Sequence, residues 1–207
     1  MKEYLSVRER ATTLTVIEKS KFYALCAPVQ NEEEAQEILQ SVRKSMPDAT
    51  HHCYGYIADT KGAIPRFSDD GEPGGTAGMP ILKAISDNGL VATLVVVTRY
   101  FGGIKLGAGG LVRAYTASAV SAIEAAGKVL YRPCGRYLCE LDYTLLNLFE
   151  RAFSRFCYRL EQTDYGEGVT LTLLMPKEAE AAFHAYLKDF SKGKAELLLL
   201  EECYAPM

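Results

Sequence analysis

The segment Leu94–Leu111 constrains the fold of this chain more than any other part of the sequence. It opens with the apolar, β-branched run LVVVT, which predicts a buried strand, and it leads into an alanine-rich stretch that predicts a helix over Leu111–Ala126. A strand that passes through a glycine loop into a helix presents backbone N–H groups at the positive end of the helix dipole, where a phosphate or another anion binds. Five glycines form this loop: Gly102, Gly103, Gly107, Gly109 and Gly110.

Two interpretations of the glycine loop remain open. In the first, the loop is an anion or RNA site, because Arg99, Lys105 and Arg113 lie in the same segment and add charge-assisted bonds. Tyr100 then offers a ring on which an unpaired base can stack. In the second, the glycines only allow turns with positive φ, and the basic side chains are solvated. Neither a Walker lysine motif nor a strand-following G-x-G-x-x-G is present, so a nucleotide site is not indicated.

A second glycine-rich segment, Phe67–Pro80, predicts an irregular loop that is dense in carboxylates. Ser68 precedes the three acidic residues Asp69, Asp70 and Glu72. The structural interpretation is that these side chains accept backbone N–H bonds and latch the loop onto the neighbouring glycine loop. The alternative is that they bind Mg²⁺ or act as an acid/base pair.

The run His51-His52-Cys53 contains metal-ligand residue types within a predicted strand, His51–Ala58. Adjacent strand residues face opposite sides of a sheet, so the three side chains cannot readily share one ion, and we expect no metal site here. One histidine is expected to be buried and hydrogen-bonded and the other to face outward. A Cys53 nucleophile with a histidine base is the less favoured alternative.

The other predicted elements follow from hydrophobic periodicity and from start and stop signals. Asn31 and Glu34 have the spacing of a capping box, and Pro47 ends the helix that begins there. The remaining elements of the first part are strands Thr12–Glu18 and Phe22–Val29 around a Lys19–Lys21 turn, a short helix Pro80–Ser86, and a strand Ala92–Thr98.

The pattern restarts after Arg132–Gly135, which predicts a linker. The expected domains are therefore residues 1–131 and residues 132–207, and the chain as a whole is predicted to be α+β. The second domain has the order βαββαβ of the ferredoxin-like motif. Its expected elements are strand Tyr137–Tyr143, helix Leu145–Tyr158, strands Arg159–Asp164 and Val169–Met175, helix Lys177–Phe190 and strand Ala195–Cys203.

The charge is distributed unevenly between these two parts. Residues 1–131 carry 14 Lys and Arg against 14 Asp and Glu, whereas residues 132–207 carry 9 against 12. The whole chain therefore has a net charge of −3 and no global basic field that would drive nonspecific nucleic-acid binding. Any contact with RNA must be local, and the first part is the better candidate for it.

Cysteine usage and hydropathy bear on the compartment. The six cysteines form no C-x-x-C motif and most lie in apolar or aromatic runs, which predicts reduced core thiols and a cytoplasmic protein. No stretch approaches the roughly 20 apolar residues that cross a bilayer, so no membrane partner is expected.

Three motifs in order resemble the YigZ/IMPACT family: the HHCY strand, the FSDDGEP and TAG loop, and the RYFGGIKLGAGGL segment. The resemblance covers roughly residues 14–126, and the rest of the chain has the length and pattern of the small C-terminal domain of the bacterial branch. It implies that the first domain is similar to domain IV of elongation factor G and to one domain of a small-subunit ribosomal protein. The second domain is similarly expected to look like domain V of that factor.

The resemblance also implies a role, since the family is known for translation-linked regulation in eukaryotes. The leading hypothesis is a non-enzymatic protein that needs no cofactor and binds RNA, the ribosome or a translation factor through the glycine-loop face. The alternative is a Mg²⁺-dependent phosphate-transferring or hydrolytic enzyme, and a third hypothesis is protein docking without a ligand. Geometry distinguishes the first two, because catalysis needs the carboxylates to converge on the anion rather than on backbone amides.

Overall fold

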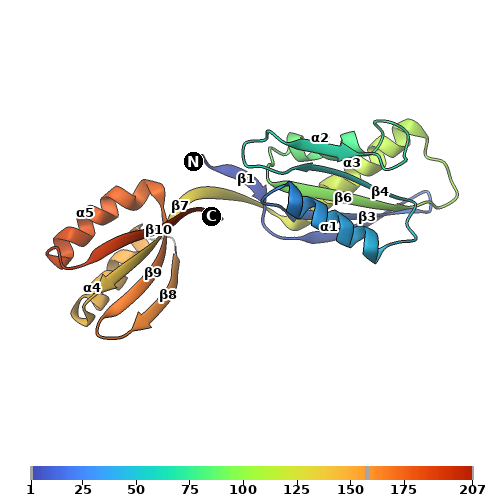
Figure 1. Ribbon diagram of the computed structural model, residues 1–207. Helices are drawn as coiled ribbons and strands as arrows, with labels where there is room; N and C mark the ends of the chain where they lie inside the picture. Colours follow the sequence, from blue (N-terminus) through green and yellow to red (C-terminus); the bar gives the residue numbers. More distant parts are fainter. Residues whose placement is uncertain (1, 157–158, 207) are drawn as a thin grey trace. The chain divides into compact units, whose positions relative to one another are not determined.

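The computed structural model describes residues 2–156 and 159–206 of the chain, which folds into two compact units of mixed α and β structure (Figure 1). One unit comprises Tyr4–Leu130, and the other combines the chain from Tyr131 onward with the few residues before Tyr4. Within the described residues, no helix is long and apolar enough to span a membrane.

The first unit is built on a five-stranded sheet in the order β2-β3-β6-β4-β5. Each of its strand pairs is antiparallel. The central strand β6 holds the apolar run predicted to be buried, and its residues from Thr93 to Arg99 are all buried. The strands are β2 (Ala11–Ile17), β3 (Ser20–Pro28), β4 (His51–Ile57), β5 (Pro65–Ser68) and β6 (Thr93–Tyr100).

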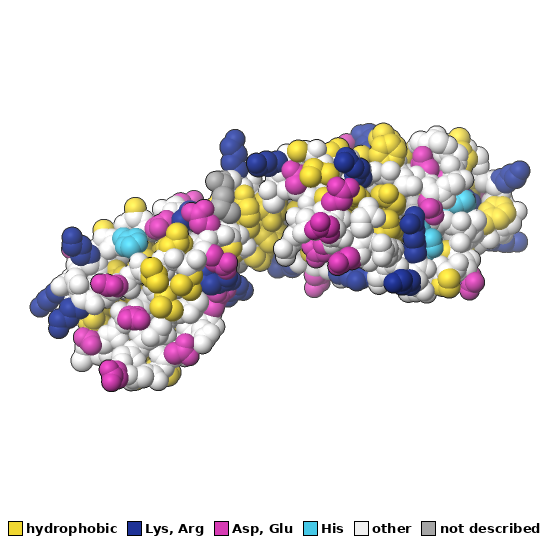
Figure 2. All heavy atoms as spheres, in the orientation of Figure 1, with side chains coloured by type: hydrophobic (Ala, Val, Ile, Leu, Met, Phe, Trp, Pro, Cys, Tyr) yellow, Lys and Arg dark blue, Asp and Glu magenta, His cyan; other side chains and the backbone are white. Residues whose placement is uncertain are grey.

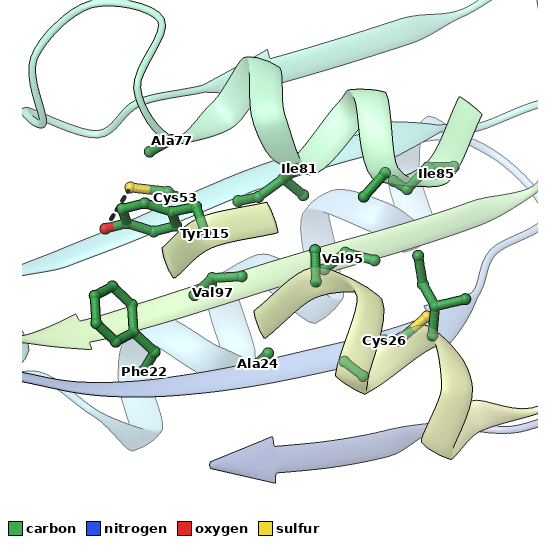
Figure 3. Packing of buried hydrophobic residues seen from close by; sticks show 14 of the residues in the cluster. Phe22, Ala24, Cys26, Cys53, Ala77, Ile81, Ile85, Val95, Val97 and Tyr115 are labelled. Atoms are coloured by element: carbon green, nitrogen blue, oxygen red, sulfur yellow. Dashed lines mark hydrogen bonds between the residues drawn. The ribbon is translucent and has the colours of Figure 1, made fainter. Parts of the chain in front are cut away.

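Helices cover both faces of this sheet. Helix α1 (Glu32–Ser45) packs on one face, where its apolar residues meet alternate side chains of β3, β4 and β6. Helices α2 (Gly78–Asp87) and α3 (Gly107–Ala126) pack on the other face (Figure 3). This second core holds Phe22, Ala24 and Cys26 of β3, Val95 and Val97 of β6, Ile81 and Ile85 of α2, and Tyr115 of α3.

The N-terminus of α1 confirms the predicted capping box. The side-chain oxygen of Asn31 accepts the Glu34 N–H at 2.8 Å, and the Glu34 carboxylate accepts the Gln30 N–H at 2.7 Å. Three glutamates lie in the first turn and two basic residues in the last, so the charges match the helix dipole at both ends.

The turn between β2 and β3 is shorter than predicted. It consists of Glu18 and Lys19, with φ of 45° and 64°, whereas Ser20 and Lys21 already belong to β3. Two consecutive positive φ angles are typical of two-residue hairpins, whose backbone twist matches that of the flanking strands. The predicted Lys19–Lys21 turn therefore begins one residue too late and ends two residues too late.

The second unit has the ferredoxin-like order of elements, βαββαβ. Its strands pair in the order β10-β7-β9-β8, and the described neighbouring pairs are antiparallel. Phe149 of α4 and Phe183 of α5 meet edge to face at 5.9 Å in the core on one face of the sheet. The elements are β7 (Lys128–Leu141), α4 (Tyr143–Phe156), β8 (Arg159–Tyr165), β9 (Val169–Pro176), α5 (Glu180–Ser191) and β10 (Glu196–Pro206).

Two further features of the prediction are wrong. The expected linker Arg132–Gly135 lies inside β7, because residues 131–140 pair with β10 and residues 134–141 pair with β9. These ladders satisfy the backbone of a segment whose Pro and Gly had indicated a break. Helix α3 begins at Gly107 rather than at Leu111, so three of the loop glycines belong to its first turns. The short strands β1 (Tyr4–Val7) and β5 were not predicted.

Candidate functional site

Asp69 organises the acidic loop. Its carboxylate accepts backbone N–H bonds from Gly75 at 2.8 Å, Ala77 at 3.0 Å and Gly78 at 2.8 Å. Helix α2 has no side-chain cap at its own N-cap residue Ala77, so Asp69 supplies the acceptor from outside the helix. Burial tends to raise the pKa of Asp69, but the three N–H bonds outweigh it and the pKa lies below its ordinary value.

The partners of the loop differ from those expected. The amides bound by Asp69 belong to the acidic loop itself and to α2, rather than to the neighbouring glycine loop, because the unpaired N–H groups of a helix start lie closer along the chain. Asp70 makes a second attachment, accepting the His52 N–H at 2.7 Å and an Arg43 N–H at 3.1 Å. The loop is thus fastened to α2, to β4 and to α1.

Replacing Asp69 by alanine is expected to lower the free energy of unfolding by about 0.5–2 kcal/mol at pH 7, the effect of losing a helix cap. The pKa of Asp69 is lowered in the folded state, so its contribution is present above the unfolded pKa of about 3.9 and disappears as the pH falls through the folded value. Urea denaturation of wild type and variant between pH 7 and pH 3 tests both points. Equal stability at pH 7 would contradict the capping role.

Glu72 is the one carboxylate of the loop that reaches the strand preceding the glycine loop. Its side chain is buried, and Oε1 accepts an Arg99 N–H at 2.6 Å and the Tyr115 O–H at 2.7 Å. The other carboxylate oxygen lies 3.9 Å from Nε2 of His51. A buried ion pair is therefore shared among the acidic loop, β6 and α3.

The charged guanidinium of Arg99 is buried and binds groups of the protein itself. Its side chain is 6% exposed, and its guanidinium lies 5.4 Å from the ring centroids of both Phe22 and Phe101. A further N–H donates to Oγ of Ser20 at 3.3 Å, and the same hydroxyl accepts the Gly102 N–H at 3.1 Å. Arg99 was predicted as a ligand for an external anion, but in the structure its anion is Glu72.

Cys53 is buried beside this ion pair. Its Sγ lies 3.0 Å from the Asp69 carbonyl oxygen and 3.4 Å from the Tyr115 hydroxyl (Figure 3). Burial raises the pKa of Cys53 to about 12. Because the thiolate is the reactive form of cysteine, this environment disfavours the nucleophilic role considered from the sequence.

The two histidines have different partners, as expected for neighbours in a strand, and His52 is buried as one of them was predicted to be. The other, His51, does not face outward, since its side chain is only 20% exposed. Nδ1 of His51 lies 2.8 Å from the Asp70 carbonyl oxygen, whereas Nδ1 of His52 lies 3.0 Å from Oγ1 of Thr98. Burial lowers the pKa of His52, and the nearby Asp70 only partly offsets this effect.

At three positions of the glycine loop, the backbone conformation or the packing requires glycine. Gly103 and Gly107 have φ of 86° and 70°, in the region that side chains disfavour. A Cβ on Gly102 would overlap the backbone of Lys19 and Ser20, because the tip of the β2–β3 hairpin packs directly on this residue.

The remaining two glycines lie in the first turns of α3. A Cβ on Gly110 would lie 3.0 Å from Cβ of Leu106, a tight contact. A Cβ on Gly109 would meet only Nη1 of Arg113, at 3.6 Å, which is ordinary van der Waals contact. Gly109 is exposed and its φ is not in the positive region, so its surroundings do not require glycine.

The start of α3 is open to solvent. Its N-cap residue Leu106 provides no side-chain acceptor, so the N–H groups of the first turn have no capping side chain. Lys105 and Arg113 are exposed and line a hollow beside this turn, together with Ile17, Glu18 and Leu106. The structure thus brings two of the three predicted cations to the glycine loop.

Comparison with known proteins identifies the first unit: residues 18–123 match the Impact N-terminal domain. The chain belongs to the IMPACT family. Residues 139–194 match a domain of unknown function, DUF1949. The IMPACT family member YvyE of Bacillus subtilis (strain 168) is 37% identical over 194 residues, covering 94% of this chain and 89% of that protein.

Two further comparisons cover most of the chain. The IMPACT family member YigZ of Escherichia coli (strain K12) is 35% identical over 204 residues, covering 98% of this chain and 100% of that protein. A solved structure described as that of a hypothetical protein is 35% identical, with a TM-score of 0.64, and the match covers 97% of this chain and 98% of the other.

The sequence of this IMPACT family member did not lead us to Tyr115 and Ser20. Tyr115 donates a hydrogen bond to Glu72, and Ser20 accepts one from Arg99. One signal for Tyr115 was available, because it is a single large aromatic residue within an alanine-rich helix. Ser20 is the first residue of β3, next to a hairpin turn of ordinary composition, and the sequence carries no comparable signal for it.

Proposed function

We propose that the protein binds single-stranded RNA of the translation machinery through the first turn of α3 and the side chains around it. One observation carries the proposal: Gly109 is exposed in the first turn of a helix where neither its φ nor a neighbouring atom requires glycine. Glycine within a helix destabilises it by roughly 0.5–1 kcal/mol relative to alanine. The residue is therefore best explained by a ligand that approaches the backbone closely.

The charge at this end of the unit suits a phosphate group. Lys105 and Arg113 flank the first turn of α3, and packing of the hairpin tip on Gly102 adds Lys19. Figure 2 shows Lys and Arg side chains protruding at the end of the unit where Figure 1 places this loop. Glu18 lies among these cations and offsets part of their charge. Free helix N–H groups with nearby cations form an anion site.

Two aromatic side chains at the end of β6 support binding of unpaired bases. Tyr100 is partly exposed and packs edge to face on Tyr23, with ring centroids 5.8 Å apart. Phe101 is 47% exposed and one face of its ring lies near the Arg99 guanidinium. Rings held in this way stack on bases irrespective of sequence. The buried Glu72–Arg99 pair then orients the stacking surface instead of contacting RNA.

The Mg²⁺-dependent enzyme is the less favoured function. Asp69, Asp70 and Glu72 each bind a different set of protein groups, namely helix amides, the β4 backbone with Arg43, and the Arg99–Tyr115 pair. The three carboxylates therefore do not converge on the glycine loop, as transfer of a phosphoryl group would require. Family membership is consistent with a regulatory role, and the proposed RNA ligand fits that role.

The test is binding of a labelled single-stranded RNA across a salt series. Gly109→Ala is expected to weaken binding while raising the free energy of unfolding by up to about 1 kcal/mol, so its two effects have opposite signs. Lys105→Ala is expected to make the salt dependence shallower. The magnitude of the negative slope of log affinity against log salt should fall by about 0.7, the contribution of one phosphate contact to a single strand.

Lys61→Ala removes another exposed cation, outside the glycine loop, and serves as the control, with unchanged binding expected. If wild type shows no salt-dependent RNA binding, or if Gly109→Ala binds as wild type does, the proposed function is wrong. Recovery of a protein partner from nuclease-treated lysate would then favour docking without RNA.

A further inference from the structure

The two edges of the first unit's sheet differ in how they are protected. The edge strand β5 has four residues and contains Pro65 and Arg66, features that discourage pairing with another chain. The opposite edge strand β2 has seven residues with the sequence ATTLTVI, without a charge or a proline. It pairs with β3 from Ala11 to Ile17 without a bulge, so its outer row of N–H and C=O groups is regular.

Strand β2 also exposes apolar side chains. Leu14 and Val16 are 51% and 60% exposed, and they lie on the same face of the strand as Thr12. On the other face, Oγ1 of Thr13 is buried and lacks a hydrogen-bond partner among the described residues. The exposed apolar side chains along an unpaired edge indicate that β2 pairs with something outside the chain.

We propose that two copies of the chain associate by antiparallel pairing of their β2 strands about a two-fold axis at Leu14. Leu14 then lies opposite Leu14 of the second copy, and Thr12 lies opposite Val16, which covers the exposed apolar side chains. Thr13 lies opposite Thr15, a cross-strand pair of β-branched side chains. The contact is isologous, so it closes as a dimer and joins the two sheets into one.

The charges at the ends of β2 favour a second copy in this register. In this register Arg10 and Glu9 of one copy lie next to Glu18 and Lys19 in the β2–β3 turn of the other copy, at both ends of the interface. All four side chains are exposed, and none takes part in an ion pair with another described residue. Sliding the strands by two residues separates both pairs. The strand itself is uncharged, so the two copies bring no like charges together.

The experiment is sedimentation velocity of the full chain over a concentration series, with charge exchange to test the register. Wild type is expected to shift with concentration toward twice the 22.8 kDa mass of one chain. Arg10→Glu and Glu18→Arg each place like charges together at two symmetric positions, and each is expected to raise the dissociation constant about tenfold. The double variant restores opposite charges and is expected to recover the wild-type value.

Lys61→Glu has the same charge change as Arg10→Glu but lies outside β2, and it is expected to leave the dimer unchanged. Leu14→Lys places two lysines at the axis and is expected to be monomeric, with circular dichroism verifying that it is folded. A wild type that is monomeric at every concentration overturns the proposal, as does a dimer that ignores the single charge changes or is not rescued by the double change. RNA binding is read separately, so failure of either proposal leaves the other measurable.

Discussion

Replacing Glu72 by glutamine is expected to lower the free energy of unfolding of the first unit by about 3–5 kcal/mol, the cost of breaking a buried ion pair from one side. The variant leaves the Arg99 guanidinium in a site where its side chain is 6% exposed, without its carboxylate at 2.6 Å. The Tyr115 hydroxyl also loses a charged acceptor. Urea denaturation followed by circular dichroism measures the loss.

The matched control is Asp87→Asn, which breaks the Lys83–Asp87 ion pair on the surface of α2. The Lys83 and Asp87 side chains are both more than half exposed, so the free energy of unfolding is expected to fall by less than about 1 kcal/mol. Replacing both buried partners, as in Glu72→Leu with Arg99→Met, is expected to cost less than the two single changes together, because neither charge is left alone. A Glu72→Gln variant within about 1 kcal/mol of wild type would refute the buried-pair account.

Substitution of Gly102 by alanine is expected to destabilise the first unit by an amount near the upper end of about 1–3 kcal/mol for an overpacked site. Its Cβ would overlap the backbone of Lys19 and Ser20, which cannot move aside as a flexible side chain can. The change also separates the Gly102 N–H from the Ser20 hydroxyl and so disturbs a contact of Arg99. Thermal denaturation and urea denaturation both report the effect.

Gly74→Ala is the control for this prediction, because a Cβ at Gly74 has no atom within 4 Å and its φ is not positive. We expect it to change stability little. Gly102→Ala and Gly109→Ala should therefore have opposite effects on stability, although both glycines belong to the same loop. If the two substitutions have the same sign, the division of the glycines into packing and ligand-facing residues is wrong.

Much of the fold could be predicted from local pattern. The central strand β6 was indicated by its β-branched apolar run, and α1 by the capping signals at Asn31 and Glu34. The short strand β5 was not predicted, since its four residues begin with proline and depend on β4 for their pairing. The linker prediction failed for a similar reason, because long-range ladders overrode the local Pro and Gly signal.

The candidate site was harder to predict, because its partners are far apart in the sequence. The carboxylate density identified the acidic loop, and local amides explain Asp69. The pairing of Glu72 with Arg99 spans 27 positions and that with Tyr115 spans 43, and no spacing rule relates such residues. Arg99 was assigned to an external anion because it lies beside the glycines in the sequence. Nothing in the sequence indicates that its side chain is buried.

The position of β6 in the sheet has a consequence for the order in which the chain folds. Strands β3 and β4 are synthesised first, but each borders β6 and they do not border each other. While the chain grows from its N-terminus, the β2–β3 and β4–β5 hairpins can form locally, yet they have no shared edge until residues 93–100 emerge. A nascent chain that stops before residue 93 can therefore hold at most two separate hairpins, and the five-stranded sheet can close only once the last central strand has emerged.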